Sequence, residues 1–553
     1  MKNTTLLFTF IISCFLCKIS YTQAPGFQWA KSAGGLKRDG AMSVAVNNSG
    51  NIYIAGVFLS PTINFGPLTL TDPSGDCTEG EIFLIKFDAN GNALWGKSEF
   101  AGVAQSLAVD ASGNIYMTGY FWGPSITFGS ITLTMVSGSN GYFLVKYNAN
   151  GDVLWAKGAS GSNAVYSRSV AVDPSGNAFV TGTFLGPNIT FGTIALTSDA
   201  SNSDYFMVKY DADGNVKWAK SAGNISPYSL SVAVDASGFA FVTGYFTGST
   251  ITFGSHTLNT AGLFFVKYDI NGNAIWAKGT VGASPNSVAV DTSGNIYMTG
   301  DMNGTSVIFD TITLTNPSLF IAKYNSDGNI VWAKSADGMN NSSPSSIALD
   351  ISGNAYITGH YFGSITLGST TLTNTNPGGT GAAYMFVAKY DTIGNVLWAK
   401  SAGGLNDTRA SSVAVSVIGD AVYTTGSTYY TLSFGNNISY FDCNTIWNAG
   451  DYDIFLAKLD TNAGSGINLL INPTAISLFP NPTANYVTIE NPNTTTKDFT
   501  LSITNIQGQQ LLSEKVVIDK THTIDLSKFP NGIYFLTLQN EKENYMSKVV
   551  VQR

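Results

Sequence analysis

Residues 107–119 read LAVDASGNIYMTG, and residues 143–157 read FLVKYNANGDVLWAK. Each stretch contains two short runs of β-branched, aromatic or aliphatic residues joined by a turn that contains glycine, which is typical of a β-hairpin. Both stretches recur along the 553-residue chain. Trp-Ala-Lys, or once Trp-Gly-Lys, begins at seven positions: Trp29, Trp95, Trp155, Trp218, Trp276, Trp332 and Trp398. The repeat is therefore about 60 residues long.

Each repeat holds four predicted strands, and nothing in it has helical periodicity. The strands are the Leu-Ala-Val-Asp, Asn-Ile-Tyr-Met-Thr-Gly, Phe-Leu-Val-Lys-Tyr and Leu-Trp-Ala-Lys types. Four strands repeated seven times predict an all-β fold, a seven-bladed β-propeller over residues 25–460. The repeat exceeds the usual ~40–45 residues of a blade because of segments such as 126–134, which predict an extra small hairpin on one rim.

The phase of the repeat predicts how the ring closes. The strand around Trp29 lacks a preceding Phe-Leu-Val-Lys-Tyr strand, and the last strand of that type, Phe455–Leu459, lacks a following Trp-Ala-Lys strand. We therefore expect the N-terminal strand to complete the seventh blade and remove the free edges of the ring. Closure would place Cys77 and Cys443 in equivalent loops of neighbouring blades, which predicts a disulfide between them, with two unpaired thiols as the alternative.

The N-terminus predicts a secretory signal peptide over residues 1–24. Lys2 supplies the positive charge, residues 6–12 begin the apolar region, and small residues near Ala24 suit cleavage. The alternative is a lipoprotein signal that would attach lipid to Cys14. The apolar stretch is too short for a retained membrane span, and no later segment is long and apolar enough to be one.

Composition and motifs exclude several classes of function. The net charge of −8 argues against a nucleic-acid partner, and the chain has only three His and four Cys, which argues against a His-rich or Cys-rich metal protein. No Ser-His-Asp set, His-Glu-x-x-His, Cys-x-x-Cys or phosphate loop is present. The sequence therefore predicts no catalytic residues, no metal ligands and no cofactor.

Two sets of acidic turns can be interpreted either as cation sites or as turns capped by their own side chains. Turns such as Asp88-Ala-Asn-Gly-Asn92 invite a calcium site, but glycine stands at position four, whereas an EF-hand loop needs it at position six. A second set of acids ends the first strand of five repeats, at Asp110, Asp173, Asp235, Asp291 and Asp350. For both sets the competing interpretation is a side chain that caps its own turn.

Candidate binding residues lie where the repeats differ, just after the Thr-Gly of the second strand. Exposed aromatic residues on a rim can stack on a sugar or grip a protein, whereas the competing interpretation is packing of the extra hairpin. The candidates are Tyr120, Trp122, Tyr245, Asp301, His360, Tyr361 and Tyr429.

The repeat, with Val-Asp-x-Ser-Gly-Asn-Ile-Tyr-x-Thr-Gly and Lys-Tyr-Asp-x-x-Gly-Asn-x-x-Trp, resembles the seven-bladed β-propeller repeat of secreted bacterial proteins. The resemblance covers about residues 27–460. It implies the fold and a secreted setting, but no common reaction.

A different module follows a predicted linker, residues 461–475. Its alternating runs over residues 476–553 predict a small Ig-like antiparallel β-sandwich. The motifs Leu-Phe-Pro-Asn-Pro-Thr at 478–483, Asn-Ile-Gln-Gly at 505–508, Pro-Asn-Gly-Ile-Tyr at 530–534 and the final Ser547–Arg553 resemble the type A C-terminal sorting domain of the type IX secretion system of Bacteroidetes. The resemblance implies the secretion machinery as partner, and a secreted or outer-membrane surface location.

We expect a non-enzymatic module that binds a glycan or a protein, or a structural adhesion component. The alternative is a propeller enzyme, a hydrolase, a lyase or a quinone-dependent dehydrogenase, because the Asp-x-x-Gly-Asn-Val-x-Trp turn is similar to the repeat of quinone-cofactor propellers.

Overall fold

The computed structural model describes residues 26–553 except 73–79, 136–137, 160, 162, 199–202, 224, 316–317, 339–341, 375–380, 405–406, 430–451, 461–476, 480–482, 491–496, 506–509 and 541–543. The predicted signal peptide, the linker 461–475 and the predicted disulfide Cys77–Cys443 lie outside the described residues. Ala24–Ala463 form one compact unit, and Gly464–Arg553 belong to a second. All regular elements among the described residues are β-strands, and no helix there has the length and apolar character needed to cross a membrane.

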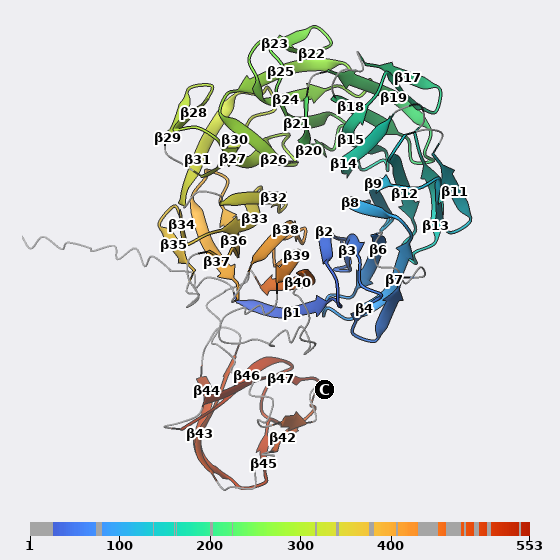
Figure 1. Ribbon diagram of the computed structural model, residues 1–553. Helices are drawn as coiled ribbons and strands as arrows, with labels where there is room; N and C mark the ends of the chain where they lie inside the picture. The colour runs from blue at the N-terminus through green and yellow to red at the C-terminus, as the bar shows by residue number, and fades with distance from the viewer. Residues whose placement is uncertain are drawn as a thin grey trace, which may run out of the picture. The chain divides into compact units, whose positions relative to one another are not determined.

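The larger unit is a ring of seven antiparallel sheets, here called blades, as Figure 1 shows. In blades 1 to 6 the strands run in chain order from the innermost, called the first strand, to the outermost, called the fourth. From first to fourth strand, blade 1 is β2 (Asp39–Val46), β3 (Ile52–Phe58), β6 (Glu81–Phe87) and β7 (Ala93–Glu99); blade 2 is β8 (Gly102–Val109), β9 (Ile115–Phe121), β12 (Gly141–Tyr147) and β13 (Val153–Lys157); blade 3 is β14 (Ala164–Val172), β15 (Ala178–Leu185), β18 (Ser203–Tyr210) and β19 (Val216–Ala222); blade 4 is β20 (Ile225–Val234), β21 (Ala240–Phe246), β24 (Gly262–Tyr268) and β25 (Ala274–Thr280); blade 5 is β26 (Ala283–Val290), β27 (Ile296–Met302), β30 (Leu319–Tyr324) and β31 (Ile330–Gly338); and blade 6 is β32 (Ser343–Leu349), β33 (Ala355–Tyr361), β36 (Tyr384–Tyr390) and β37 (Val396–Ala402).

Blade 7 joins the two ends of the ring. Its first three strands are β38 (Thr408–Val415), β39 (Ala421–Tyr429) and β40 (Tyr452–Asp460), and its fourth is β1 (Phe27–Ala33) from the N-terminal end of the unit. In the antiparallel register Trp29 faces Lys458 and Ala33 faces Ile454. The predicted closure by the N-terminal strand is confirmed.

Six short hairpins lie between the second and third strands of blades 1 to 6, where the repeat exceeds the usual blade length. They are β4 (Thr62–Phe65) with β5 (Leu68–Thr71), β10 (Ser125–Phe128) with β11 (Ile131–Thr134), β16 (Asn188–Phe191) with β17 (Ile194–Thr197), β22 (Ile251–Phe253) with β23 (His256–Leu258), β28 (Ser306–Phe309) with β29 (Ile312–Thr315), and β34 (Ser364–Leu367) with β35 (Thr370–Thr373). The predicted extra hairpin is confirmed in these six blades.

Antiparallel pairing fixes which connections share a face of the ring. Turns between the first and second strands, and between the third and fourth, lie on one face, called the turn face. Connections from second to third strand, and from each blade to the next, lie on the opposite face, called the connection face.

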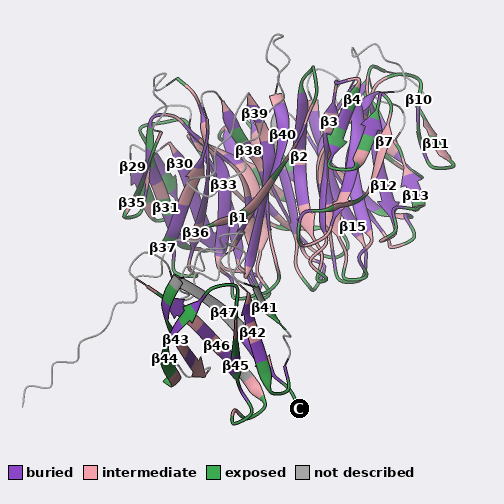
Figure 2. Ribbon diagram, turned by 90° about the horizontal axis from the view of Figure 1, so that it is seen from below, coloured by how far each residue is buried: buried purple, intermediate pink, exposed green. Residues whose placement is uncertain are grey.

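The hydrophobic core is divided among the seams between blades. Each seam has its own cluster of buried residues drawn from two neighbouring blades, including the closing seam, where Ile54 and Phe83 of blade 1 pack with Tyr423 and Leu456 of blade 7. Figure 2 shows that burial is concentrated in the middle strands. These strands are apolar on both faces because a blade lies against each face.

A ring of seven hydrogen bonds links the first strands. The serine before each Val-Ala-Val-type run accepts a bond from a backbone N–H of the next blade, over 3.0–3.3 Å. The acceptors are Ser43, Ser106, Ser169, Ser231, Ser287, Ser346 and Ser412, and the donors are the N–H groups of Leu107, Val170, Val232, Val288, Ile347, Val413 and Val44, in the same order. The last bond runs from blade 1 back to blade 7, so the ring of bonds is closed.

The repeated tryptophan also joins neighbouring blades. The indole Nε1–H of Trp155 donates to the carbonyl of Ala212, in the turn between the third and fourth strands of the next blade, at 3.0 Å. Gly214 of that turn has a φ of +79°, and a Cβ on it would lie 2.9 Å from the indole. Glycine is therefore required there twice, for the turn conformation and for the close approach of the indole. Trp218 and Trp332 make the same bond to the next blade.

The C-terminal unit contains two antiparallel sheets with a shared core. One holds β41 (Ser477–Phe479), β42 (Tyr486–Glu490) and β45 (Thr521–Asp525); the other holds β43 (Lys497–Asn505), β44 (Gln510–Ile518), β46 (Gly532–Gln539) and β47 (Asn544–Val551). Val487, Leu501, Ile524 and Leu538 lie in the core between them. The guanidinium of Arg553 donates to the carbonyls of Leu526 and Phe529, so the last residue is held against the sandwich.

Candidate functional site

The second strand of each blade ends at the connection face, and the residue after its Gly varies between blades. These residues are Val57, Tyr120, Thr183, Tyr245, Asp301, His360 and Ser427, and all except Thr183 are partly exposed. The preceding Gly cannot carry a side chain, because a Cβ at Gly119 would lie 2.0 Å from the carbonyl oxygen of Val103 in the first strand. The same close approach is seen at Gly56, Gly182, Gly300, Gly359 and Gly426, so the pairing of the two strands holds the varied residue in a fixed place in six blades.

The first strand contributes a second varied position that the sequence did not reveal. In six blades this strand has a β-bulge directly before the bonded serine, and the extra residue is partly exposed. The six residues are Met42, Gln105, Arg168, Asn286, Ser345 and Ser411. A bulge redirects a side chain and is common beside functional sites. The signal that could have found it is the recurring serine, whose position marks the residue before it.

Aromatic residues and an arginine meet at the seam between blades 2 and 3, in what we call the Tyr120 cluster. The ring of Tyr120 lies 6.2 Å from that of Trp122 and makes an edge contact at 5.0 Å with Tyr166 of the next blade. The guanidinium of Arg168 lies 5.6 Å from the centre of the Tyr166 ring. The amide of Asn140 donates to the Tyr166 hydroxyl at 2.6 Å, which fixes that ring. All five side chains have some exposed surface.

A second group, the Arg409 cluster, lies at the seam between blades 6 and 7. Arg409 is ion-paired to Asp407 at 2.9 Å and lies 5.7 Å from the centre of the Phe362 ring. Phe362 makes an edge contact at 5.9 Å with His360. The Tyr452 hydroxyl donates to Asp407 at 3.3 Å.

The Arg409 cluster extends toward blade 1 through Tyr452. The ring of Tyr452 lies 5.4 Å from that of Tyr429, and the guanidinium of Arg38 lies 5.5 Å from its centre. The structure therefore brings His360 and Tyr429, two of the predicted residues, into one cluster with two arginines.

The charge states in the Arg409 cluster follow from burial and from these contacts. Burial, with a further contribution from the Arg409 charge, lowers the pKa of His360 to about 4, so the imidazole is neutral at pH 7. Burial acts to raise the pKa of Asp407, but hydrogen bonds from the Ala383 N–H and from Arg409 outweigh it and leave that pKa below its ordinary value. Two arginines and one carboxylate thus give the cluster a net positive charge in a chain whose overall charge is −8.

The remaining candidates do not join either cluster. Asp301 accepts a hydrogen bond from Asn286 at 3.0 Å, and burial raises its pKa. Tyr245 is partly exposed, and no ring partner is seen for it among the described residues. Tyr361 was wrongly placed with the exposed rim residues, because its side chain is fully buried in the core between blades 5 and 6. It follows His360 in the strand, so it points to the opposite face of the sheet.

The acidic turns are self-capped. Asp88 Oδ1 accepts hydrogen bonds from the N–H groups of Asn90 and Asn92, and its Oδ2 accepts one from the Asn92 amide. Asp110 makes the same three bonds in the other set of turns. Within the described ranges, no three His, Cys, Asp or Glu side chains lie close enough together to hold a metal ion.

Comparisons with known proteins agree with this architecture. Residues 155–183 and 280–306 match the β-propeller repeat family, and residues 477–552 match the secretion system C-terminal sorting domain. An uncharacterized WD repeat-containing protein of Acanthamoeba polyphaga mimivirus is 26% identical over 531 residues, covering 78% of this chain and 38% of that protein. The chain thus spans well under half the length of this relative.

Two solved structures are similar at low identity. The Dos1 propeller has a TM-score of 0.40 at 8% identity, covering 78% of this chain and 94% of that structure. Sqt1 of Saccharomyces cerevisiae has a TM-score of 0.32 at 6% identity, covering 73% and 96%. The chain thus contains matches to the β-propeller repeat and a secretion system C-terminal sorting domain, and the sorting domain implies secretion or an outer-membrane surface location.

Proposed function

We propose that the propeller is a non-enzymatic module that binds a glycan or a protein outside the cell, through the Tyr120 and Arg409 clusters of its connection face. The sorting domain implies contact with the secretion machinery, which leaves the propeller as the cargo. One observation carries the proposal: half-exposed aromatic and arginine side chains gather at positions where the blades differ in sequence.

The contrast between shared and varied positions supports this assignment. Serine, tryptophan and the turn glycine recur in the blades because each of them joins one blade to the next. Tyr120 and Arg168 stand at positions where the residue varies, since blade 4 alone has a second tyrosine, Tyr245, at the position of Tyr120, so the scaffold does not require them. Tyrosine, tryptophan and arginine are the residues that dominate binding interfaces, and aromatic rings also stack on sugars.

The test is a glycan array together with a pull-down from extracellular fractions, both with the full chain. We expect one assay to give a ligand, and the Tyr120→Ala/Arg168→Ala variant to lose at least tenfold in affinity. Ile393→Ala is the matched control, because Ile393 is exposed on the turn face. Absence of ligand in both assays would refute the proposal, as would a variant that binds like the control.

The alternative, an enzyme, has one observation in its favour. Burial raises the pKa of both Asp39 and Glu99 to about 7, as in many catalytic acids. However, Asp39 begins the first strand of blade 1 and Glu99 ends the fourth, so three strand spacings, about 14 Å, separate their strands. An absorbance scan and a metal analysis of the purified protein test this alternative, because a quinone band or bound metal would favour it.

A further inference from the structure

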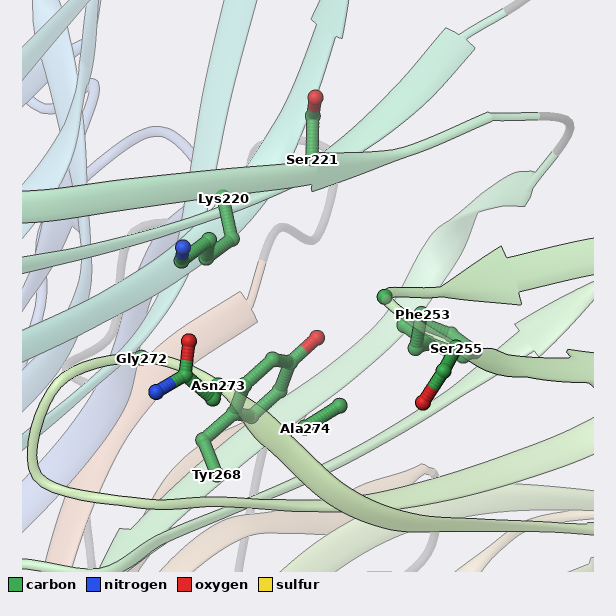
Figure 3. A pocket seen from close by; sticks show the side chains of 9 residues that line it. Lys220, Ser221, Phe253, Ser255, Tyr268, Gly272, Asn273 and Ala274 are labelled. Atoms are coloured by element: carbon green, nitrogen blue, oxygen red, sulfur yellow. The ribbon is translucent and has the colours of Figure 1, made fainter.

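A cavity of about 270 Å³ lies in the outer part of the seam between blades 3 and 4, away from both clusters. The fourth strand of blade 3, the β22–β23 hairpin and the turn before β25 form its walls. The cavity is lined by Lys220, Ser221, Phe253, Gly254, Ser255, Tyr268, Gly272, Asn273 and Ala274. Figure 3 labels all of these residues except Gly254. The volume lies just below the range of ~300–1,000 Å³ typical of drug-sized ligands, so it suits a molecule of monosaccharide size.

The cavity is open here because of one small residue. Blades 2, 3 and 6 carry valine at the position of Ala274, and a methyl group of this valine lies 3.3, 3.3 and 3.0 Å from the Cβ position of the hairpin glycine. In blade 4 the nearest atom to that position at Gly254 is the Ala274 Cβ, at 3.8 Å. Blade 1 also has alanine, Ala93, but its hairpin carries Pro67 where blade 4 carries Ser255.

At the seam between blades 4 and 5, the equivalent position holds a carboxylate from the chain itself. In blade 5 the hairpin carries Asp310 in place of glycine, and its Oδ2 pairs with the Lys278 ammonium at 3.0 Å. The same oxygen accepts a hydrogen bond from the Ile330 N–H at 3.3 Å. Lys278, Asp310 and Ile330 correspond to Lys220, Gly254 and Ala274 of the cavity. The chain itself thus places a carboxylate at blade 5 where blade 4 leaves a space.

The lysine of the cavity is available for such a group. In the described part of the chain, Lys220 makes no ion pair within 4.0 Å. The nearby carboxylate of Asp269 is already occupied, because it accepts bonds from the N–H groups of Asn271 and Asn273 and from the Asn273 amide. Lys220 is the weakest of the influences that lower the pKa of Asp269.

We propose that this cavity binds a small hydroxylated carboxylate, of which a hexuronate is representative. The Lys220 ammonium and the Ala274 N–H are the counterparts of the Lys278 ammonium and the Ile330 N–H, which hold the carboxylate at the next seam. The hydroxyl of Ser255, on the β22–β23 hairpin, lies in the wall and supplies a partner for a ligand hydroxyl group. This site is independent of the binding proposed for the connection face.

The test is a titration of the full chain with glucuronate and, separately, with glucose, in which binding is measured by ligand-observed NMR. We expect glucuronate to bind at least tenfold more tightly than glucose. Ala274→Val should fill the cavity as in blades 2, 3 and 6, and Gly254→Asp should supply an internal carboxylate as in blade 5. Both variants, and Lys220→Met, are expected to weaken glucuronate binding at least tenfold.

Ala93→Val is the matched control, because it makes the same substitution at the same position in blade 1, and it should leave binding unchanged. Melting temperatures report whether each variant folds; Ala274→Val introduces a side chain that three other blades already accommodate. Three outcomes would overturn the proposal: no saturation by glucuronate up to about 10 mM, equal binding of glucose, or loss of binding in Ala93→Val but not in Ala274→Val.

Discussion

Replacing Gly214 by alanine tests the contact that joins one blade to the next. The residue lies in the turn of blade 3 with a φ of +79°, and a Cβ on it would meet Trp155 at 2.9 Å and Lys157 at 2.6 Å. Gly238, in another turn of the propeller, has a φ of +81°, but a Cβ there would meet only ordinary contacts, the nearest at 3.5 Å. The pair therefore separates the cost of the backbone conformation from the cost of displacing the indole.

The two costs are of similar size. Alanine in a left-handed conformation costs about 1–2 kcal/mol, and both variants bear this cost. Gly214→Ala also overpacks the seam, at about 1–3 kcal/mol, and disturbs the Trp155–Ala212 hydrogen bond, at about 1 kcal/mol. We expect Gly214→Ala to lower the free energy of unfolding by about 2 kcal/mol more than Gly238→Ala does.

Urea unfolding followed by tryptophan fluorescence measures this difference. All nine tryptophans precede residue 461, so the signal comes from the propeller and not from the sorting domain. If the two variants lost the same free energy within about 0.5 kcal/mol, the indole would not be packed against the turn of the next blade, and our account of the seam would be wrong.

Three further outcomes follow from buried groups. Burial raises the pKa of Asp39 from 3.8 to about 7, so the folded state holds its proton more tightly, and the free energy of unfolding should fall by up to about 4 kcal/mol as the pH rises from 4 to 7. In urea unfolding of Asp39→Asn this part of the pH dependence should be absent. A difference in stability between the two proteins that stays constant from pH 4 to 7 would contradict the assignment. Ser231→Ala should cost about 1–2 kcal/mol, because the buried N–H of Val288 loses its acceptor, whereas Ser237→Ala, in an exposed turn, should cost less than about 0.5 kcal/mol in the same urea assay. His360 should stay neutral down to about pH 4 in an NMR titration, and a midpoint near 6.5 would show that its ring is not buried.

The fold was predictable because it depends on local patterns that repeat. The hairpin signals locate the strands in each repeat, and the unmatched strand at each end of the repeat region predicts the closure between Trp29 and Lys458. The self-capped turns were also within reach, because Asp88 and its bonding partners are at most four residues apart.

The surface was harder to predict because it depends on contacts between blades. Tyr120 and Tyr166 are 46 residues apart, and their contact exists only through the seam. The bulge that adds Arg168 to the strand is marked in the sequence only by the serine that follows it, Ser169, and that serine could be recognised as a marker only once its bond to the next blade was known. Tyr361 shows the opposite error: a shift of one residue along a strand separates a partly exposed side chain from a buried one.

The pairing of Phe27 with Leu459 has a consequence for biogenesis. A chain synthesised N-terminus first presents β1 more than 400 residues before its partner strand β40 exists. Until then the propeller is an open arc with an unpaired strand edge at each end, and bringing the two ends together costs about 5 kcal/mol in chain entropy. A translation product that stops short of residue 452 would keep both ends open, ready to capture a strand from another molecule. Pairing of the first strand with β40 thus makes synthesis through residue 460 a condition for a closed ring without free strand edges.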